Sequence, residues 1–600
     1  MTELKRYIQA GVAHSFILHL NVGDYVAVVE EEAQDGTKTK HQLSLRQVFR
    51  QELLRDRKMV IFYDRSQGVT FGGVTTEDRD RMEQFFRKLN GIGGKDPLPI
   101  SPLHALAAIE RVLTASEEDQ KAGGGEVLGD ASVAVVIGFA ETLIPAGNVG
   151  AMPDADRTNI VTVSRWARSQ TIASRKNLIF MLTVNAAEIA PHVRGSAADV
   201  VSVKIPFPDL AARVQFLKDL AARFGDRFKI AEGTTIEAIA KIASGLSLRA
   251  LEDMVQLAIH DVRPLDIPLV FEEKRKLIEA LSGGLLRVVR PNASFDDIGG
   301  LTEVKRELVR VADAMKKGDI LGVPEGVLLM GPPGTAKSVL SEAVAEYVGI
   351  PMVDLRTIRD MWVGSSEQRQ ELALTIIDEL QPVIVRRDEA DAEDRKRGAD
   401  QQDSTGVNQR LQKREFEFFS DPQRRGKVLL FRITNRPDLM DPAALRAGRS
   451  DLRIPVLPSP KDLPDIMDRL MRMLSRQLQK EQGRELRWNV TGAQINGAHS
   501  AQVKEYTGAD VRAFLAEAGN VATRRGADMV TMDDIKEAAE DYLPTKDATE
   551  YAFMISLALS FCTFKRLIPL EWQEKLERRA VEAAREAFQK SRGGGPPSVN

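Results

Sequence analysis

The chain has 600 residues, 43% of them apolar and 28% charged, and this length is enough for about three to five structural units. Its net charge of −3 at neutral pH gives no general attraction to nucleic acid or anionic membranes, so neither is an expected partner. A single cysteine, Cys562, excludes a disulfide framework and favours a cytoplasmic protein, and the longest apolar stretch, at 551–564, is too short to span a bilayer.

The first half of the chain predicts an α/β domain over 1–205 and a helical domain over 206–285. Its first strand, at 15–20, is followed by a turn with no lysine at the spacing that a phosphate-binding loop requires. The Gly-Thr-Lys-Thr sequence at 36–39 resembles the end of such a loop, but no glycines precede it and it lies too far from the strand. Glu141 is the only acidic residue expected at the end of a neighbouring strand. We therefore expect this domain to have a structural role.

Three apolar segments of the first half recur in the second half at an offset of about 250 residues. A near-constant offset across three strands indicates an internal duplication of one unit, a parallel sheet followed by a small helical domain. The expected fold class is therefore α/β, with two such modules, the first of which has lost its phosphate-binding residues. The matching segments are 134–141 with 383–389, 177–185 with 427–435, and 204–206 with 453–455.

The second half alternates apolar strands with helical patterns, as an open parallel sheet requires. After a linker at 286–297, we expect an α/β domain at 298–457, a helical lid at 458–545, and C-terminal helices with a disordered tail at 546–600. The expected strands are 326–330, 351–355, 382–385, 428–434 and 452–456, and the expected lid helices are 461–480, 508–525 and 533–542.

Residues 331–338 read Gly-Pro-Pro-Gly-Thr-Ala-Lys-Ser and follow an apolar strand, which is typical of a phosphate-binding loop. A glycine-rich turn that opens a helix aims backbone N–H groups and the helix dipole at one point. Lys337 is then expected to contact the β- and γ-phosphates of a nucleotide, and the Ser338 hydroxyl to hold Mg²⁺. Ala336 stands where the consensus has glycine, and it costs about 1–2 kcal/mol if the backbone there is left-handed.

Hydrolysis of ATP requires a metal-holding carboxylate beside this loop and a second carboxylate that activates water. Asp388 and Glu389 supply this pair at the end of a predicted strand. Asn435 follows the next strand, where we expect it either to orient the attacking water or only to cap a turn. Arg446 and Arg449 lie too far along the chain to reach their own loop, which suits arginine fingers offered to a neighbouring subunit.

Five motifs of the second half together resemble the AAA ATPases of the AAA+ superfamily. They lie at 294–301, 331–338, 388–389, 434–449 and 506–510, and the resemblance extends over about residues 294–540. A degenerate first module before an active one is similar to the arrangement in tandem-domain unfoldases of this family. The resemblance implies a homo-hexameric ring that binds ATP and Mg²⁺.

The resemblance also implies roles for individual residues. Asn435 would be a sensor, Arg449 an arginine finger acting in trans, and Trp362 and Val363 part of a central-pore loop, although a half-buried anchor is the alternative for Trp362. The implied nucleotide contacts are Asp297, Ile298, Gly299, Pro333, Gly334, Thr335, Ala336, Lys337, Ser338, Val339, Gly508 and Ala509.

Several residues depart from the family pattern. Arg386 and Arg387 occupy strand positions that are apolar in the family, and Arg432 raises the same problem in the next strand. A buried unpaired charge costs several kcal/mol, so these arginines are paired, exposed at the strand end, or damaging. We favour the damaging interpretation, in which Arg386 and Arg387 compete with Mg²⁺ for the neighbouring carboxylate and apolar replacements raise both turnover and stability. Ser450 and Leu452 replace an aromatic residue and a second arginine finger.

The combined motifs predict an ATPase that remodels proteins by threading polypeptide through the pore of its ring. The alternative is an ATP-binding scaffold whose ring forms on nucleotide but turns over poorly, and the ATPase rate compared with ring assembly separates the two. A DNA helicase or loader is a weaker hypothesis, because the sequence shows no basic groove. The seven histidines include no His-Glu-x-x-His pair, which excludes proteolysis of the zinc type.

Overall fold

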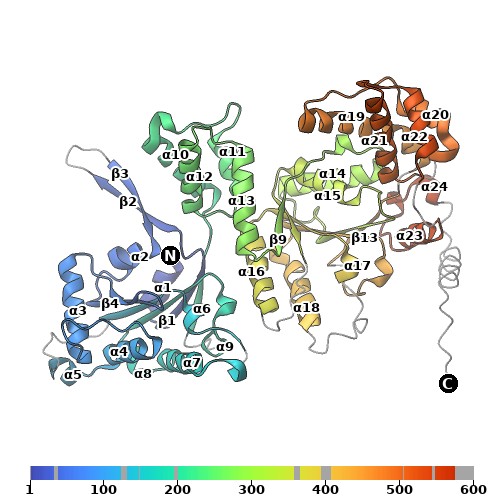
Figure 1. The fold of residues 1–600 in the computed structure, drawn as a ribbon. Helices are drawn as coiled ribbons and strands as arrows, with labels where there is room; N and C mark the ends of the chain where they lie inside the picture. Colours follow the sequence, from blue (N-terminus) through green and yellow to red (C-terminus); the bar gives the residue numbers. More distant parts are fainter. Residues whose placement is uncertain are drawn as a thin grey trace, which may run out of the picture. The chain divides into compact units, whose positions relative to one another are not determined.

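The computed structural model describes residues 2–573, with gaps at 33–37, 123–131, 148, 195–199, 357–364, 394–406, 447, 458, 504–505 and 544–547. These residues fall into two compact units, one formed mainly by residues up to Leu277 and the other mainly by residues from Ile278 onward (Figure 1). Each unit contains a six-stranded, mostly parallel sheet, so the predicted α/β fold class with two sheet modules is confirmed. No helix within the described residues combines the length and the hydropathy that a membrane crossing needs.

The sheet of the second unit has the strand order β14-β10-β13-β12-β11-β9. Five strands run parallel, as predicted, and β9 pairs with β11 in the antiparallel direction at one edge. Strand β9 lies in the segment that was expected to be a linker. The sequence did not predict it, because an alternating pattern of only four residues does not stand out. The bounds are β9 (Leu286–Val289), β10 (Gly326–Met330), β11 (Met352–Leu355), β12 (Val383–Arg387), β13 (Val428–Thr434) and β14 (Leu452–Pro455).

Helices cover this sheet on both faces (Figure 1). Helices α14 (Thr302–Lys317) and α15 (Lys337–Val348) contribute to the core on one face, and α18 (Val407–Phe419) and α23 (Ala548–Ser560) to the core on the other. Every residue of β10, β12 and β13 is buried, as parallel strands in such a sheet are, and this includes their arginines. The other helices of this half outside the lid are α16 (Ser365–Glu379), α17 (Ala390–Glu393) and α24 (Leu570–Gln573).

Four helices form the lid of the second unit around a core of their own. The three predicted lid helices are confirmed with small shifts at their ends, and α20 is an addition. Thr507 and Asp510 form a capping box at the start of α21, which fixes where this helix begins. The bounds are α19 (Leu463–Gln482), α20 (Gly492–Val503), α21 (Gly508–Arg524) and α22 (Met532–Asp541), and the short strands β15 (Arg487–Trp488) and β16 (Met529–Val530) pair beside them.

The sheet of the first unit has the strand order β5-β4-β6-β7-β1-β8. Its five parallel strands follow the same spatial order as those of the second sheet, with β4, β6, β7, β1 and β8 in the places of β11, β12, β13, β10 and β14. The three sequence repeats fall on corresponding strands. The bounds are β1 (Ser15–Leu20), β4 (Met59–Asp64), β5 (Gly68–Phe71), β6 (Val133–Ile137), β7 (Leu178–Thr183) and β8 (Val200–Ile205).

A hairpin of β2 (Tyr25–Glu32) and β3 (Lys38–Ser44) follows β1. Lys38 and Thr39 are therefore strand residues, not part of a phosphate-binding loop. The helices of this half are α1 (Thr2–Ala10), α2 (Leu45–Val48), α3 (Thr76–Asn90), α4 (Pro102–Thr114), α5 (Glu117–Ala122), α6 (Ala140–Leu143), α7 (Asp154–Ala167), α8 (Gln170–Ser174), α9 (Pro191–Arg194), α10 (Leu210–Phe224), α11 (Ile236–Ile242), α12 (Leu248–His260) and α13 (Ile267–Leu281).

Asp24, shortly after β1, ties the sheet of the first unit to its helical domain. Its carboxylate accepts hydrogen bonds at 3.0 Å from the backbone N–H groups of both Leu248 and Arg249, in the first turn of α12, and at 2.8 Å from the Asn21 amide. Asp24 is 2% exposed. A side chain of the chain itself therefore satisfies this positive helix end, where a phosphate would otherwise be attracted.

Candidate nucleotide site

The loop at 331–338 joins β10 to α15 in the way that a phosphate-binding loop requires. Helix α15 begins at Lys337, so the first-turn N–H groups of that helix, which have no helical partners, lie next to the loop. Ala336 has φ 67° and ψ 23°, which is the left-handed region. The expected strain at this position is therefore confirmed, at a cost of about 1–2 kcal/mol that glycine would avoid.

A cavity of about 470 Å³ opens beside this loop. The ends of β12 and β13, the segment 293–301 and the lid helices α19 and α21 complete its walls. The fold thus brings the predicted site residues of the α/β domain and of the lid together. Those that line the cavity are Asp297, Ile298, Gly299, Pro333, Gly334, Thr335, Ala336, Lys337, Ser338, Val339, Asp388, Glu389, Asn435, Gly508 and Ala509.

Glycines allow the lid to approach the loop closely. The Ala509 N–H donates to the Gly334 carbonyl oxygen at 3.3 Å, and a Cβ on Gly508 would lie 2.9 Å from the same oxygen. A Cβ on Gly299 would lie 2.4 Å from Cα of Ile466 in α19. A side chain at either glycine would push the lid outward, so these two positions set the width of the cavity.

Lys337 is buried at the loop, with 7% of its surface exposed. Its ammonium donates to the carbonyl oxygens of Gly331 and Pro332 at 2.9 and 2.6 Å. Burial lowers the pKa of Lys337 from 10.5 to about 8, although the charges of Asp388 and Asp391 act in the opposite direction. The ammonium is therefore mostly charged at neutral pH and loses its charge in mildly alkaline solution.

We expect ATP binding to weaken as the pH rises through about 8. Only the protonated Lys337 attracts phosphate, and bound phosphate raises the pKa of this lysine, so binding takes up a proton near this pH. Above that pKa the dissociation constant rises by at most about tenfold per pH unit. Isothermal titration calorimetry in two buffers of different ionisation enthalpy measures the uptake. A pH-independent affinity between about pH 7.5 and 9.5, where phosphate itself is fully ionised, would contradict this role of Lys337.

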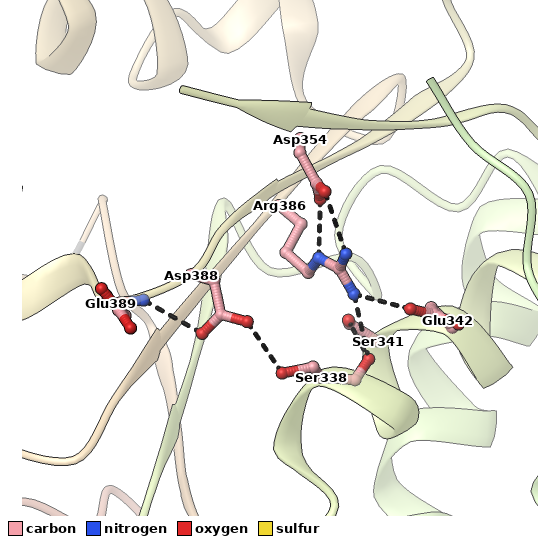
Figure 2. Close-up of polar contacts among 7 residues, drawn as sticks. All are labelled: Ser338, Ser341, Glu342, Asp354, Arg386, Asp388 and Glu389. Carbon is pink, nitrogen blue, oxygen red and sulfur yellow. Dashed lines mark hydrogen bonds and ion pairs between the residues drawn. The ribbon is translucent and has the colours of Figure 1, made fainter. Parts of the chain in front are cut away.

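Ser338, Asp388 and Glu389 lie next to one another (Figure 2). The Ser338 hydroxyl donates to Asp388 Oδ2 at 2.8 Å, and the Glu389 N–H donates to Asp388 Oδ1 at 3.0 Å. Glu389, two residues after the end of β12, has φ 51°, a left-handed conformation that is uncommon outside glycine. Phe139, two residues after the end of β6, has φ 50°. The first unit thus repeats this backbone conformation without the carboxylate, and its Glu141 lies further along, in α6.

The oxygens of Ser338 and Asp388 fit a Mg²⁺ site. Mg²⁺ prefers oxygen ligands and is usually held by one or two carboxylates together with substrate phosphates and water. A hydroxyl and a carboxylate 2.8 Å apart, at a phosphate-binding loop, provide this donor set. Among the described residues, no cluster of three or more histidine, cysteine or acidic side chains offers a metal site of another kind.

Arg386 and Arg387 are buried, and both are paired with carboxylates. The Arg386 guanidinium donates to Asp354 at 2.7 and 3.0 Å and to Glu342 at 2.9 Å (Figure 2). Arg387 faces the opposite side of the sheet and donates to Glu415 at 2.5 Å. The expected competition with Mg²⁺ for Asp388 is therefore wrong, because each arginine has a carboxylate partner other than the one expected to hold the metal.

Arg432, in β13, is also buried and contacts the residues that lead into β14. It donates to the Arg449 carbonyl oxygen at 2.7 Å, and the guanidinium groups of Arg432 and Arg449 lie 5.7 and 4.3 Å from the centre of the Phe416 ring. Neither Arg449 nor the exposed Arg446 is among the residues that line the cavity. The structure thus does not bring the two predicted arginine fingers to the site of their own chain.

Sequence reasoning predicted Gly508 and Ala509 of α21 but missed the part of the cavity wall that the lid helix α19 supplies. Ile466, Leu470 and Met473 of α19 line the cavity. Their spacing of three to four residues places them on one helix face, which the sequence alone cannot distinguish from a face in the lid core. Arg512 also lines the cavity, and the sequence could have predicted this, because Arg512 lies one helical turn after Gly508 on the same helix face.

Comparison with protein families finds three matches along the chain. Residues 1–206 match a family described as the N-terminal Rossmann-like domain of AAA+ chaperones, and residues 211–283 match the second helical domain of AAA+ chaperones. Residues 327–457 match the ATPase family associated with various cellular activities, AAA. The third match contains the loop, the Asp388–Glu389 pair and Asn435.

Curated relatives of the chain include ATP-dependent zinc metalloproteases. FtsH 3 of Symbiobacterium thermophilum is 33% identical over 267 residues, which are 42% of this chain and 40% of the relative. FtsH 3 of Sphaerobacter thermophilus is 31% identical over 281 residues, which are 46% of this chain and 54% of the relative. Chloroplastic FTSH 1 of Arabidopsis thaliana is 32% identical over 266 residues, which are 42% of this chain and 34% of the relative. The chain thus spans between 34% and 54% of the length of these relatives. With the parallel sheet and the assembled site, these similarities show that residues 327–457 of the chain form a domain of the AAA family.

Proposed function

We propose that the protein binds and hydrolyses ATP at the cavity of its second unit. The observation that carries this proposal is the convergence of the phosphate-binding loop, the Asp388–Glu389 pair and the lid around one cavity. The loop N–H groups, the dipole of α15 and Lys337 bind the phosphates. Ser338 and Asp388 hold Mg²⁺, which when bound neutralises charge on the phosphates.

The remaining predicted residues have roles in the hydrolytic step. Glu389 acts as the general base that takes a proton from the attacking water, a task that requires an ionised carboxylate next to the γ-phosphate. Asn435 lines the cavity at the end of the neighbouring strand and orients the same water. Arg449, which does not line its own cavity, acts as an arginine finger on an adjacent subunit and stabilises the charge that develops on the phosphate.

We infer a tandem arrangement in which the first unit is a degenerate module that binds no nucleotide. The shared strand order of the two sheets supports a duplication. In the first unit, Asp24 accepts hydrogen bonds from the N-terminus of α12. The corresponding helix end of the second unit, at the start of α21, lines the cavity instead. Phe139 stands where a catalytic carboxylate would be needed. The inferred modules are 1–205 with the helical domain 206–285, and 298–457 with the lid 458–545.

We further propose that six chains form a ring whose hydrolysis cycle threads polypeptide through a central pore in the cytoplasm. The support is the similarity of the first unit to domains of AAA+ chaperones and the two arginines that do not line their own cavity. Trp362 and Val363, the expected pore-loop residues, lie outside the described residues. The strained Ala336 is the observation that favours the second candidate, an ATP-dependent scaffold with slow turnover.

Native mass spectrometry and electron microscopy of the full chain, with and without a slowly hydrolysed ATP analogue, test these proposals together with the steady-state ATPase rate. Hexamers with one nucleotide per chain and steady turnover are expected. Rings that form without turnover would favour the scaffold. Two nucleotides per chain would contradict the degenerate first module, and a chain that binds no nucleotide would overturn the proposed function.

A further inference from the structure

We propose that Arg386 is a positioning residue for the pair formed by Ser338 and Asp388, an inference that rests on the proposed ATPase function. Arg386 lies in β12, two residues before Asp388. Its guanidinium group reaches β11 through Asp354 and α15 through Glu342 and the Ser338 carbonyl oxygen (Figure 2). One side chain therefore connects the strand that presents the carboxylate, the neighbouring strand, and the helix that presents the hydroxyl.

The contacts of Arg386 use the geometry of the guanidinium fork. Nε and Nη2 donate to the two oxygens of Asp354 at 2.7 and 3.0 Å, which is a bidentate pair. Nη1 donates to Glu342 at 2.9 Å and to the Ser338 carbonyl oxygen at 3.4 Å. The same carbonyl oxygen accepts a hydrogen bond from the Ser341 hydroxyl at 2.6 Å. The first turn of α15 is thus held at the residue that carries the metal-binding hydroxyl.

A purely structural role does not explain an arginine at this position. The Arg386 side chain is 10% exposed, and an apolar residue would meet the burial requirement of a sheet covered on both faces. Burial opposes the charge of Arg386, yet Asp354 and Glu342 raise its pKa above the ordinary value, so the guanidinium remains charged. What an apolar residue cannot do is fix α15 relative to β12. The 2.8 Å contact between Ser338 and Asp388 depends on the distance between α15 and the end of β12.

Arg387 provides a matched control. It is the next residue of the same strand, its side chain is 9% exposed, and it also pairs with a buried carboxylate. Its partner, Glu415, belongs to α18 on the opposite face, away from the phosphate-binding loop. Loss of Arg387 therefore removes a comparable buried ion pair without touching the connection between β12 and α15.

The test measures the affinity for Mn²⁺, a paramagnetic stand-in for Mg²⁺, of the full chain complexed with a non-hydrolysable ATP analogue, by electron paramagnetic resonance. Arg386→Met is expected to weaken metal binding by about tenfold, as changes beside metal ligands typically do, while analogue affinity without metal is unchanged. Arg386→Lys keeps the charge but loses the fork, so the deficit should persist. Arg387→Met should retain the wild-type metal affinity.

A second variant keeps the test valid if Arg386→Met folds poorly. Arg386→Met/Asp354→Asn/Glu342→Gln removes all charges of the cluster together, and it should fold while still binding Mn²⁺ about tenfold more weakly. Metal affinity equal to that of Arg387→Met, in either variant that folds, would overturn the positioning role. Failure of the wild-type chain to bind the ATP analogue would instead overturn the proposed function.

Discussion

Replacement of Lys337 by alanine is expected to weaken ATP binding by about a hundredfold, because the charge-assisted hydrogen bonds of its ammonium to the phosphates are lost. Glu389→Gln is expected to leave ATP affinity unchanged and to lower the turnover number by about a thousandfold, since only the activation of water is removed. The ATP-bound state should therefore accumulate in Glu389→Gln. Calorimetric titration and a steady-state phosphate-release assay measure the two effects separately.

Glu141→Gln in the first unit is the control for this pair of variants. It is expected to change neither affinity nor turnover, because the position that corresponds to Glu389 is occupied by Phe139. Wild-type ATP affinity in Lys337→Ala would exclude the cavity as the nucleotide site. Wild-type turnover in Glu389→Gln would show that another residue activates water, with the cavity still a nucleotide site.

Much of the fold could be predicted because buried parallel strands appear in a sequence as continuous apolar runs. The predicted strands at 326–330 and 428–434 have the observed bounds of β10 and β13. Strand β9 could not be predicted, because its four residues are short and pair with β11 through contacts that are set only in the folded sheet.

The candidate site, like the fold, has a part that the sequence could predict and a part that it could not. The loop at 331–338 and the Asp388–Glu389 pair carry chemistry in a local pattern, so their positions and spacing were sufficient to predict them. The partners of the buried arginines were not predictable, because Glu342 is 44 residues from Arg386 and Glu415 is 28 residues from Arg387. Such pairs depend on which elements the fold places side by side, and no local pattern reveals this.

The pairing of Arg387 reverses the expected effect of an apolar residue in β12. Glu415 is 2% exposed, and the carboxylate lies 2.5 Å from the Arg387 guanidinium. Arg387→Leu removes the counter-ion of a deeply buried charge, so it is expected to lower the free energy of unfolding of the second unit by about 3 kcal/mol or more. Calorimetry of the full chain measures the change, with the second unit identified as the transition that an ATP analogue shifts.

The double variant Arg387→Leu/Glu415→Leu separates the loss of an ion pair from the loss of packing. With both charges removed, no buried charge is left without its counter-ion, so the double variant should be more stable than Arg387→Leu alone. Packing losses alone would instead add, and the double variant would then be the less stable of the two. A higher melting temperature for Arg387→Leu than for the wild type would show that burying the guanidinium destabilises the fold by more than its ion pair with Glu415 stabilises it. This arginine would then be damaging to stability.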